Sequence, residues 1–199
     1  FNGDLLSTGY WAAKIGEIKP GETAAVIGAG PTGLCSMLCA RLYGPSKIIA
    51  IDTDEFRLKL AKEKGLADVI LAPGKDDIES RIRALTDGRG ADTVFEAAGG
   101  KDTFQTAWKI ARPNAIVTIV AMYGEPQILP LPDMYGKNLI FKTGGVDGCC
   151  CQEIMDLTAA GKLDASFLIT HRCGLDQIMD AYDVFEKKKD HVIKYAVSL

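Results

Sequence analysis

The chain of 199 residues is 47% apolar and 25% charged, an ordinary globular composition that excludes a disordered or collagen-like chain. Its formal net charge is −3 and its basic residues are spread along the sequence, so no basic patch for nucleic acid or anionic lipid is expected. The longest apolar run, 115–123, is interrupted by Thr118 and is far shorter than the roughly 20 residues of a membrane-spanning helix. The composition therefore predicts a globular protein with neither a nucleic-acid nor a membrane partner.

The cysteines and the first residues of the chain indicate the cellular compartment of the protein and whether the chain is a fragment. Six cysteines are too few for a disulfide scaffold in a chain of this length, and no Cys-x-x-Cys pair occurs. The sequence begins at Phe1 with neither a methionine nor a signal peptide. We therefore expect a cytoplasmic protein of which this chain is a fragment.

Short runs rich in Val and Ile alternate with helical patterns between residues 23 and 141, which is typical of a parallel sheet covered by helices on both faces. We expect an α/β fold of the doubly wound Rossmann type, with six strands in the spatial order 3-2-1-4-5-6. The strands are predicted at 23–27, 47–51, 68–71, 93–96, 116–120 and 139–141. The helices are predicted at 6–18, 31–43, 54–64, 77–86 and 103–111, and Asp102 and Gln105 have the spacing of a capping box for the last one.

After residue 145 the alternation of strands and helices stops. Helices are predicted at 150–160 and 175–185, followed by a last strand at 191–197. These segments would form a C-terminal helical and strand return attached to the sheet.

The strongest motif is a G-x-G-x-x-G sequence formed by Gly28, Gly30 and Gly33, which follows a predicted strand and opens a predicted helix. In a dinucleotide-binding loop the first glycine allows a tight turn, the second lets a pyrophosphate approach the backbone, and the third lets helix and strand pack closely. Pro31 and Thr32 fall in the first helical turn. Proline is tolerated there because an N–H at that position would have no partner in the helix, and the free N–H groups of the turn can face an anion. The motif predicts a dinucleotide site, with a tight turn that binds nothing as the alternative.

An acidic residue, Asp52, ends the second predicted strand. A carboxylate at that place hydrogen-bonds the adenosine ribose and repels a 2′-phosphate, so Asp52 favours NAD over NADP. Arg57 follows at the start of the next predicted helix. It either reaches the same ribose or is a solvated helix residue.

Several segments together resemble one protein family. They are the Leu-Ser-Thr-Gly-Tyr sequence at 6–10, the glycine loop, Asp52, the Gly-Ala-Asp-Thr-Val-Phe-Glu-Ala-Ala-Gly sequence at 90–99 and the Leu-Ile-Thr-His-Arg sequence at 168–172. In this order, and over nearly the whole chain, they resemble the zinc-dependent medium-chain alcohol dehydrogenase family. Because one fold hosts many functions, this ordered set is more specific than the glycine loop alone.

The resemblance implies the NAD-binding portion of an enzyme that moves hydride between an alcohol carbon and a nicotinamide. Residues 13–146 would form the NAD-binding domain, and 1–12 with 147–199 would be remnants that pack on an absent catalytic domain. Zinc would be a cofactor of the full-length protein only, because the family's Cys and His ligands lie in the absent domain. We expect the chain to bind NAD without turnover, acting by orientation of the cofactor.

By the same resemblance, Asp4 stands at the position of a third zinc ligand, usually Cys and in some secondary-alcohol and polyol enzymes an acidic residue. A catalytic zinc site needs three protein ligands, so Asp4 alone would be an orphan ligand. In this chain we expect Asp4 to cap the helix that follows it, which is compatible with a ligand role.

Further cofactor-binding positions are implied only by the resemblance. Residues 141–146 resemble the segment where cofactor and catalytic domains meet. A basic residue near the pyrophosphate is often Arg in the family; Lys lacks the bidentate fork, so a weaker or water-mediated contact is open here. The positions are Thr8 at the nicotinamide ring, Ala97 and Ala98 on the adenosine ribose side, Val120 and Met122 at the carboxamide, and Lys194 near the pyrophosphate.

No function is assigned to the cysteines and histidines. Cys35 and Cys39 lie on a helix that must pack on the sheet, so buried small side chains are expected rather than metal ligands. The consecutive cysteines 149–151 point in different directions and cannot form a tetrahedral site alone, although a reactive thiol at a helix start is an alternative. His171 has no nucleophile motif near it and is not expected to be catalytic.

Two functions remain open at this point. One is the NAD-binding part of a zinc-dependent alcohol or polyol dehydrogenase, and the other is a stand-alone NAD-binding or redox-sensing module. The C-terminal segments favour the first, because a module alone would leave their surface exposed. The substrate would be an alcohol, aldehyde or polyol, and a homodimer through the unpaired sixth strand, 139–141, is expected.

Overall fold

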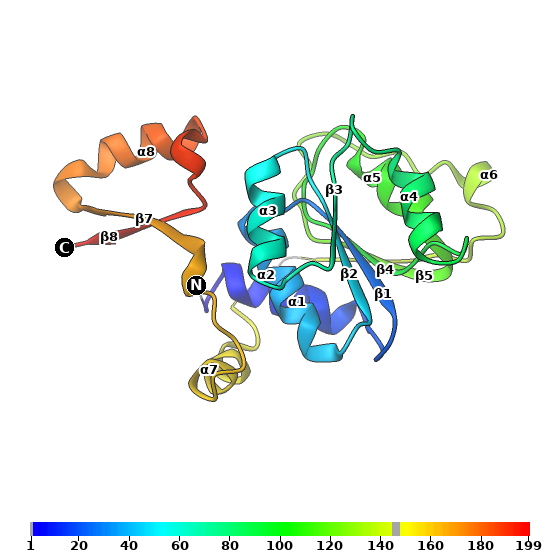
Figure 1. Ribbon diagram of the computed structural model, residues 1–199, viewed down its shortest axis with the longest axis horizontal. Coiled ribbons are helices and arrows are strands. Elements are labelled where there is room, and N and C mark those ends of the chain that lie inside the picture. The colour runs from blue at the N-terminus through cyan, green and yellow to red at the C-terminus, as the bar shows by residue number, and fades with distance from the viewer. Residues whose placement is uncertain (1, 145–147) are drawn as a thin grey trace.

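The computed structural model describes residues 2–144 and 148–199. Six parallel strands form one sheet in the order β3-β2-β1-β4-β5-β6 (Figure 1). The predicted α/β Rossmann fold and its strand order 3-2-1-4-5-6 are therefore confirmed. The strands are β1 Thr23–Ile27, β2 Lys47–Ile51, β3 Val69–Leu71, β4 Ala91–Glu96, β5 Ala111–Ile119 and β6 Ile140–Thr143.

The two central strands, β1 and β4, are buried along their whole length because helices cover both faces of the sheet. Successive side chains point to opposite faces, so Ala24 packs on one side and Ala25 on the other. Ala25 lies in register between Ile49 of β2 and Val94 of β4. Val, Ile, Ala and Phe make up most of these two strands because neither face meets water, and the polar residues Asp92, Thr93 and Glu96 of β4 are buried with them.

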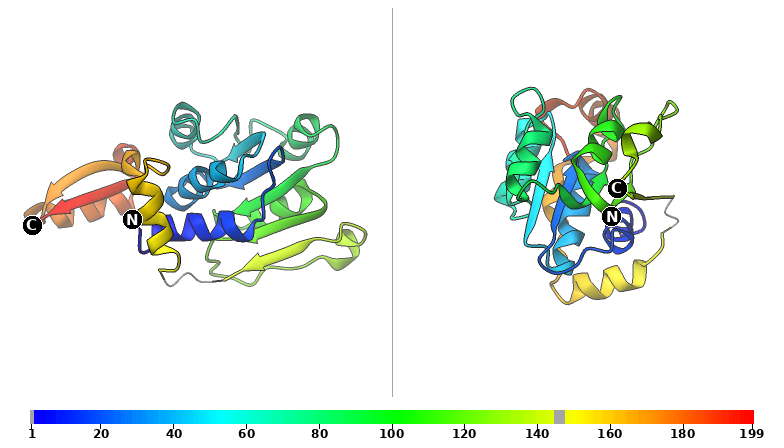
Figure 2. Two further views of the ribbon diagram at one scale, coloured as in Figure 1. Left: turned by 90° about the horizontal axis from the view of Figure 1, so that it is seen from below. Right: turned by 90° about the vertical axis from the view of Figure 1, so that its right-hand side faces the viewer.

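Helices lie on both faces of the sheet (Figures 1 and 2). One face is covered by α1 Leu5–Ile15, α2 Pro31–Ala40 and α3 Glu55–Glu63. The other face is covered by α4 Ile78–Leu85 and α5 Thr103–Ile110, with the short helix α6 Leu131–Met134 packed against α5. Among the residues described, no helix combines the length and the apolar character needed to cross a membrane.

The predicted capping box of α5 is wrong. The Asp102 side chain makes no capping hydrogen bond among the described residues. The Gln105 amide is used elsewhere: Nε2 donates to Ile128 O at 2.8 Å and Oε1 accepts from Trp108 Nε1 at 2.8 Å. Gln105 therefore holds the loop after β5 instead of the start of its own helix.

Several element boundaries differ from the predicted ones for local reasons. The helix predicted at 6–18 ends at Ile15, and Glu17 has a left-handed backbone with φ of 51°. The helix predicted at 31–43 becomes 3-10 over Arg41–Tyr43 and ends at Gly44, whose φ is 68°. β5 begins at Ala111, where the sequence pattern places the end of the preceding helix.

The last part of the chain lies partly outside the sheet domain. Helix α7 Cys151–Ala159 contributes Ile154 to the core under α1. β7 Ile169–Gly174 and β8 Lys194–Ser198 form a separate two-stranded parallel sheet, with α8 Ile178–Glu186 between them in the chain. We call residues 169–198 the C-terminal unit, and it projects from the body of the molecule (Figures 1 and 2).

The sequence predicts no strand at β7 because Ile-Thr-His-Arg-Cys-Gly contains no apolar run. β8 begins at Lys194 rather than 191, since Asp190 and His191 adopt left-handed φ values of 51° and 57° in the preceding turn. The expected domain boundary at 146, and Gly145 and Val146 of the 141–146 segment, lie outside the described residues.

Candidate cofactor-binding site

The glycine loop connects β1 to α2 at the carboxyl end of the sheet, where the strand order reverses between β1 and β4. Such a switch point is where open α/β sheets bind ligands. Gly28 has a φ of 97°, and a Cβ there would lie 2.9 Å from Ala97 C. A Cβ on Gly33 would lie 1.8 Å from Gly28 O. Packing within the chain therefore requires glycine at both positions.

Gly30 differs from the two other glycines of the loop. Its φ of −69° and ψ of −179° are accessible to ordinary residues. Among the described residues, a Cβ there would meet a single atom within 4 Å, Arg57 Nη1 at 3.6 Å. The packing of the chain gives no reason for glycine at this position, whereas the close approach of a ligand would.

The start of α2 offers donors to an anion. Pro31 occupies the first turn, and the first bond of the helix runs from Leu34 N to Gly30 O at 2.9 Å. The N–H groups of Thr32 and Gly33 precede that bond and have no partner within the helix. Together with the positive end of the helix dipole, they favour a phosphate at the open side of Gly30.

Asp52 follows β2 and lies against the glycine loop. Its Oδ2 accepts from Ala29 N at 2.5 Å, and its Oδ1 accepts from Asp54 N at 2.8 Å. Each carboxylate oxygen has a second lone pair, so these bonds leave acceptor capacity for a ribose hydroxyl. The carboxylate therefore both fixes the loop and can face a ligand beside it.

Arg57 lies in the first turn of α3, whose N-cap Asp54 accepts from Phe56 N at 2.9 Å. Arg57 Nε is 3.4 Å from Asp54 Oδ2, and its side chain is 17% exposed. The guanidinium points toward the open side of Gly30. Of the two alternatives for Arg57, this placement favours a contact with a ligand over a solvated helix residue.

The loops after β4 and β5 carry Ala97, Ala98, Val120 and Met122, four of the positions assigned to the cofactor. Ala97 N donates to Ile27 O at 2.8 Å, so Ala97 lies directly beside the glycine loop. Val120 N donates to Glu96 O at 2.8 Å, and the Met122 side chain is 95% exposed. The structure thus brings Ala97 and Val120 to one edge of the sheet, and Met122 lies exposed to solvent beside them.

Glu96, the last residue of β4, is a feature of this edge that the sequence reasoning missed. Its side chain is fully buried. Oε1 accepts from Ala98 N at 3.0 Å and from Gly99 N at 2.9 Å, and Oε2 is buried without a hydrogen-bond partner among the described residues. The available signal was a charged residue directly after the apolar Val94 and Phe95 at the end of the strand.

Asp4 and Thr8 lie at the start of α1. Thr8 N and Oγ1 donate to Asp4 O at 2.7 and 2.8 Å, whereas the Asp4 carboxylate makes no capping hydrogen bond within the described residues. The prediction that the Asp4 side chain caps this helix is wrong, because the φ of −141° and ψ of −80° at Asp4 lie outside the extended conformation of an N-cap residue. Asp4 and Lys194 line one hollow of about 270 Å³.

The described residues offer too few ligands for the zinc ion that the family resemblance implies. In residues 2–144 and 148–199, no three His, Cys, Asp or Glu side chains form a group that could hold a metal ion. Asp4 is therefore not part of a metal-binding group in the described chain, and the residues present do not fit a zinc ion by themselves.

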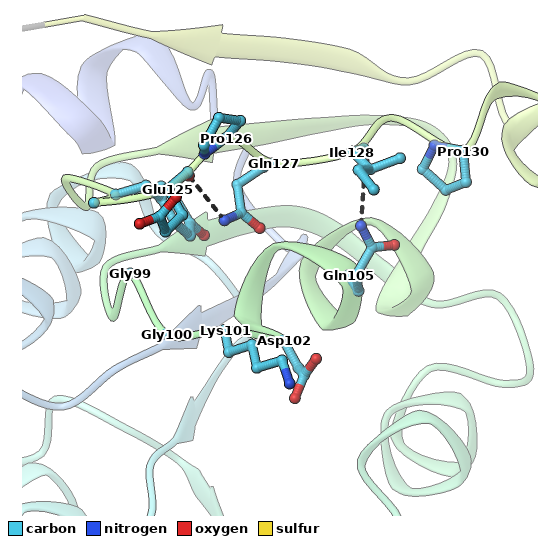
Figure 3. Close-up of a pocket in the computed structure, with 12 residues that line it drawn as sticks. Gly99, Gly100, Lys101, Asp102, Gln105, Glu125, Pro126, Gln127, Ile128 and Pro130 are labelled. Carbon is cyan, nitrogen blue, oxygen red and sulfur yellow. Dashed lines mark hydrogen bonds between the residues drawn. The ribbon is translucent and has the colours of Figure 1, made fainter.

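A cleft of about 780 Å³ adjoins this edge of the sheet (Figure 3). In the close-up, Gly99 to Asp102 lie on one side of it and Glu125 to Pro130 on the other. It separates the loop after β4 from the loop after β5. The residues lining it are Gly99, Gly100, Lys101, Asp102, Gln105, Tyr123, Gly124, Glu125, Pro126, Gln127, Ile128 and Pro130.

The six cysteines differ in their burial and in their partners. Cys35 and Cys39 are buried as expected, and burial raises the pKa of Cys35 to about 12 and that of Cys39 further. Cys151 Sγ donates to Gly148 O at 2.7 Å, while Cys150 Sγ lies 3.8 Å from Lys14 Nζ. The consecutive thiols 150 and 151 thus point to different partners, as predicted for residues without a shared metal.

A six-stranded parallel sheet with a glycine loop at its switch point defines a Rossmann-type fold. The family model of zinc-binding dehydrogenases matches residues 31–167 of this chain. An alcohol dehydrogenase of Cupriavidus necator is 34% identical over 200 residues, which are 98% of this chain and 54% of that protein. An NADP-dependent isopropanol dehydrogenase of Thermoanaerobacter brockii is also 34% identical, over 98% of this chain and 57% of that protein.

Solved structures agree with these relatives. An alcohol dehydrogenase from Thermus sp. ATN1 matches with a TM-score of 0.93 and 32% identity, covering 100% of this chain and 57% of that one. The chain belongs to the zinc-binding dehydrogenase family. It spans about half the length of the relatives that it matches.

Proposed function

We propose that this chain is the NAD-binding portion of a zinc-dependent alcohol or polyol dehydrogenase. One observation carries the proposal. Gly28 and Gly33 are required by packing within the chain, whereas Gly30 leaves open space at the positive end of α2. Room for close backbone approach beside free N–H groups is what a pyrophosphate requires.

When bound, the nicotinamide cofactor supplies the hydride acceptor or donor. The residues of the chain bind and orient it, which contributes to catalysis by fixing the distance and angle of the reacting atoms. Asp52 accepts a ribose hydroxyl, and Arg57 lies beside the same ribose. The remaining contacts are proposed for Thr32 and Gly33 at the pyrophosphate, Lys194 near it, Ala97 beside the ribose, Val120 and Met122 at the carboxamide, and Thr8 at the nicotinamide ring.

The alcohol would be activated by groups outside this chain. Asp4 is the proposed zinc ligand from this chain, and the two further ligands would come from elsewhere in the full-length protein. We therefore expect cofactor binding without turnover by the chain alone. The relatives named alcohol dehydrogenase and isopropanol dehydrogenase support an alcohol substrate, and Asp4 slightly favours secondary alcohols or polyols.

The choice of NAD over NADP rests on the Asp52 carboxylate, which would repel a 2′-phosphate. Three relatives are named as NADP-dependent, so the choice needs a direct measurement. Calorimetric titration should give tighter binding of NADH than of NADPH by at least about tenfold. In an Asp52→Gly variant that preference should shrink or invert, and an unchanged preference would remove Asp52 as its cause.

A Gly30→Ala variant tests the proposal itself. The added methyl group would occupy the space assigned to the pyrophosphate, so NADH binding should weaken by about tenfold or more. Its free energy of unfolding should stay within about 0.5 kcal/mol of wild type, because a Cβ there meets only Arg57 Nη1 at 3.6 Å among the described residues. Equal NADH affinity in both proteins would refute a pyrophosphate at Gly30.

A homodimer through the edge of the sheet is the proposed assembly. β6 is the edge strand, its Ile140 is half exposed, and Leu131 of the nearby α6 is exposed as well. Unpaired edge strands pair readily with a symmetry-related copy. Light scattering should therefore give twice the mass of one chain, and a clean monomer would contradict this assembly.

A further inference from the structure

We infer that Glu96 and Tyr123 are positioning residues that hold the loops after β4 and β5 in register with each other, and so shape the nicotinamide half of the cofactor site. The inference rests on the proposed function, because it assigns roles within the same site. Neither side chain is among the residues assigned above to contact the cofactor.

Glu96 bonds to both loops at once. Its main-chain carbonyl accepts from Val120 N at 2.8 Å and from Ala121 N at 3.0 Å, at the end of β5. Its Oε1 accepts from Ala98 N and Gly99 N, which form the turn after β4. A single residue therefore sets the position of one loop relative to the other.

The turn held by Glu96 is pressed against the loop after β5. Gly99 has a φ of 64°, and a Cβ there would lie 2.7 Å from Met122 O. A small displacement of this turn would therefore move the backbone of Met122, one of the groups proposed for the carboxamide. The close approach transmits the position of the Glu96 side chain to the cofactor edge.

A carboxylate is a costly side chain at this place. Glu96 is fully buried, and its Oε2 has no hydrogen-bond partner among the described residues. Burying a carboxylate without a cation is costly, and a neutral side chain would avoid that cost. A carboxylate does provide a stronger acceptor for the two loop N–H groups, which restricts the turn more tightly.

Tyr123 completes the link from the other side. It follows β5 and is partly buried, and its hydroxyl oxygen lies 3.3 Å from Thr103 Oγ1 at the start of α5. Burial raises the pKa of the Tyr123 hydroxyl, Thr103 opposes this, and the neighbouring Glu96 carboxylate raises the pKa again. The hydroxyl thus stays protonated, and its contact with Thr103 joins the loop after β5 to the start of α5, beside the cleft that Tyr123 lines.

The two halves of the cofactor can be probed separately. AMP contains the adenosine half, which would contact Asp52 and the glycine loop, whereas NADH also contains the nicotinamide half. Calorimetry would measure the dissociation constants of both for wild type, Glu96→Gln and Tyr123→Phe. Asp92→Asn is the matched control, because Asp92 is a buried carboxylate at the opposite end of the same strand.

In Glu96→Gln the weaker neutral acceptor should raise the dissociation constant of NADH about tenfold and leave that of AMP within about twofold. Tyr123→Phe should raise the NADH constant about threefold with AMP unchanged. Asp92→Asn should lower the thermal midpoint without changing the ratio of NADH to AMP affinity. This ratio is a readout that a general loss of stability does not move.

The other outcomes separate the inference from the proposed function. If wild type binds neither AMP nor NADH, the proposed cofactor site itself fails. If wild type binds both and the ratio is unchanged in Glu96→Gln and Tyr123→Phe, only the positioning roles are overturned. Binding of AMP without NADH by wild type also overturns them, since the nicotinamide half would then not be formed. Should Glu96→Gln fail to fold, the ratio in Tyr123→Phe decides.

Discussion

The sheet body and the C-terminal unit are built from the same kinds of residues but differ in how completely they bury them. In the body, β1 and β4 are buried throughout. In the C-terminal unit, Met179 and Tyr182 both lie on α8, and they are 74% and 64% exposed. Large apolar side chains exposed together mark an interface surface. The central strands of the body are fully packed, and exposed apolar side chains such as Leu131 and Ile140 lie near its edge strand β6, whereas α8 presents Met179 and Tyr182 to solvent.

Among the described residues, Ile193 and His191 attach the unit to the body near its base. Ile193 is buried in the core beneath α1 and α2, and its N–H donates to Thr170 Oγ1 at 2.9 Å. The His191 ring stacks on Phe56 of α3 with a centroid distance of 4.3 Å. The C-terminal unit is therefore held in place by a few contacts at one end. Substitutions in the body and substitutions on α8 should change the free energy of unfolding by very different amounts.

The largest effect is expected for Gly33→Ala in the body. The added Cβ would fall 1.8 Å from Gly28 O, so the loop and α2 must separate. The free energy of unfolding should drop by about 3 kcal/mol, the upper part of the usual range for overpacking. Urea denaturation would measure it, with Gly124→Ala as the control because a Cβ there meets no described atom within 4 Å. Equal stability of the two variants would contradict tight packing of the body.

An intermediate effect is expected from acid. Burial alone would raise the pKa of Asp92, but bonds from Thr23 N at 2.8 Å and Arg112 Nε at 2.5 Å outweigh it and lower the pKa. A carboxyl with a lowered pKa in the folded state stabilises the fold above its unfolded pKa of about 4 and loses this contribution as the pH falls through the folded value.

Asp92→Asn should therefore cost about 1 to 2 kcal/mol of unfolding free energy at pH 7. The same variant should lose less stability than wild type between about pH 5 and pH 2. Urea denaturation at a series of pH values gives both numbers. Parallel curves for wild type and variant would show that Asp92 does not couple folding to protonation.

The smallest effect is expected on α8. Met179→Ser removes an exposed side chain, so the free energy of unfolding should change by no more than about 0.5 kcal/mol. Self-association at high protein concentration should decrease, because the exposed apolar surface is reduced. A loss of stability comparable to that of Gly33→Ala would mean that α8 is packed as tightly as the body, and would remove the contrast.

The sheet could be predicted from sequence because its strands contain short runs rich in Val, Ile and Ala, separated by helices whose ends carry readable signals such as Gly44 and Asp54. β7 could not, since its Thr, His and Arg residues pair with β8 without forming an apolar pattern. The two capping errors have different causes. Asp4 lacks the extended backbone conformation of an N-cap residue, whereas the Gln105 side chain is engaged by Ile128 O and Trp108 Nε1.

The residues of the candidate site that belong to short sequence patterns were predicted, whereas a residue whose role depends on partners distant in the sequence was missed. The glycine loop and Asp52 follow from short sequence patterns, and the structure brings them together through the bond from Ala29 N to the Asp52 carboxylate. Glu96 was missed because its importance depends on Val120 and Gly99. Such partners become visible only when two strand ends are placed side by side.

The two buried clusters of the body also differ in the stretch of chain that builds them. The cluster beneath α4 and α5 draws its buried residues from 25–117, whereas the one beneath α1, α2 and α3 joins Leu6 to Leu168 and Ile193. During synthesis on the ribosome, the first cluster can close once β5 has emerged, while the second must wait for nearly the whole described chain. The half of the body that carries the glycine loop is therefore the last to complete its core. Proteolytic cleavage before Ile193 should expose the core of that half before the core of the other half.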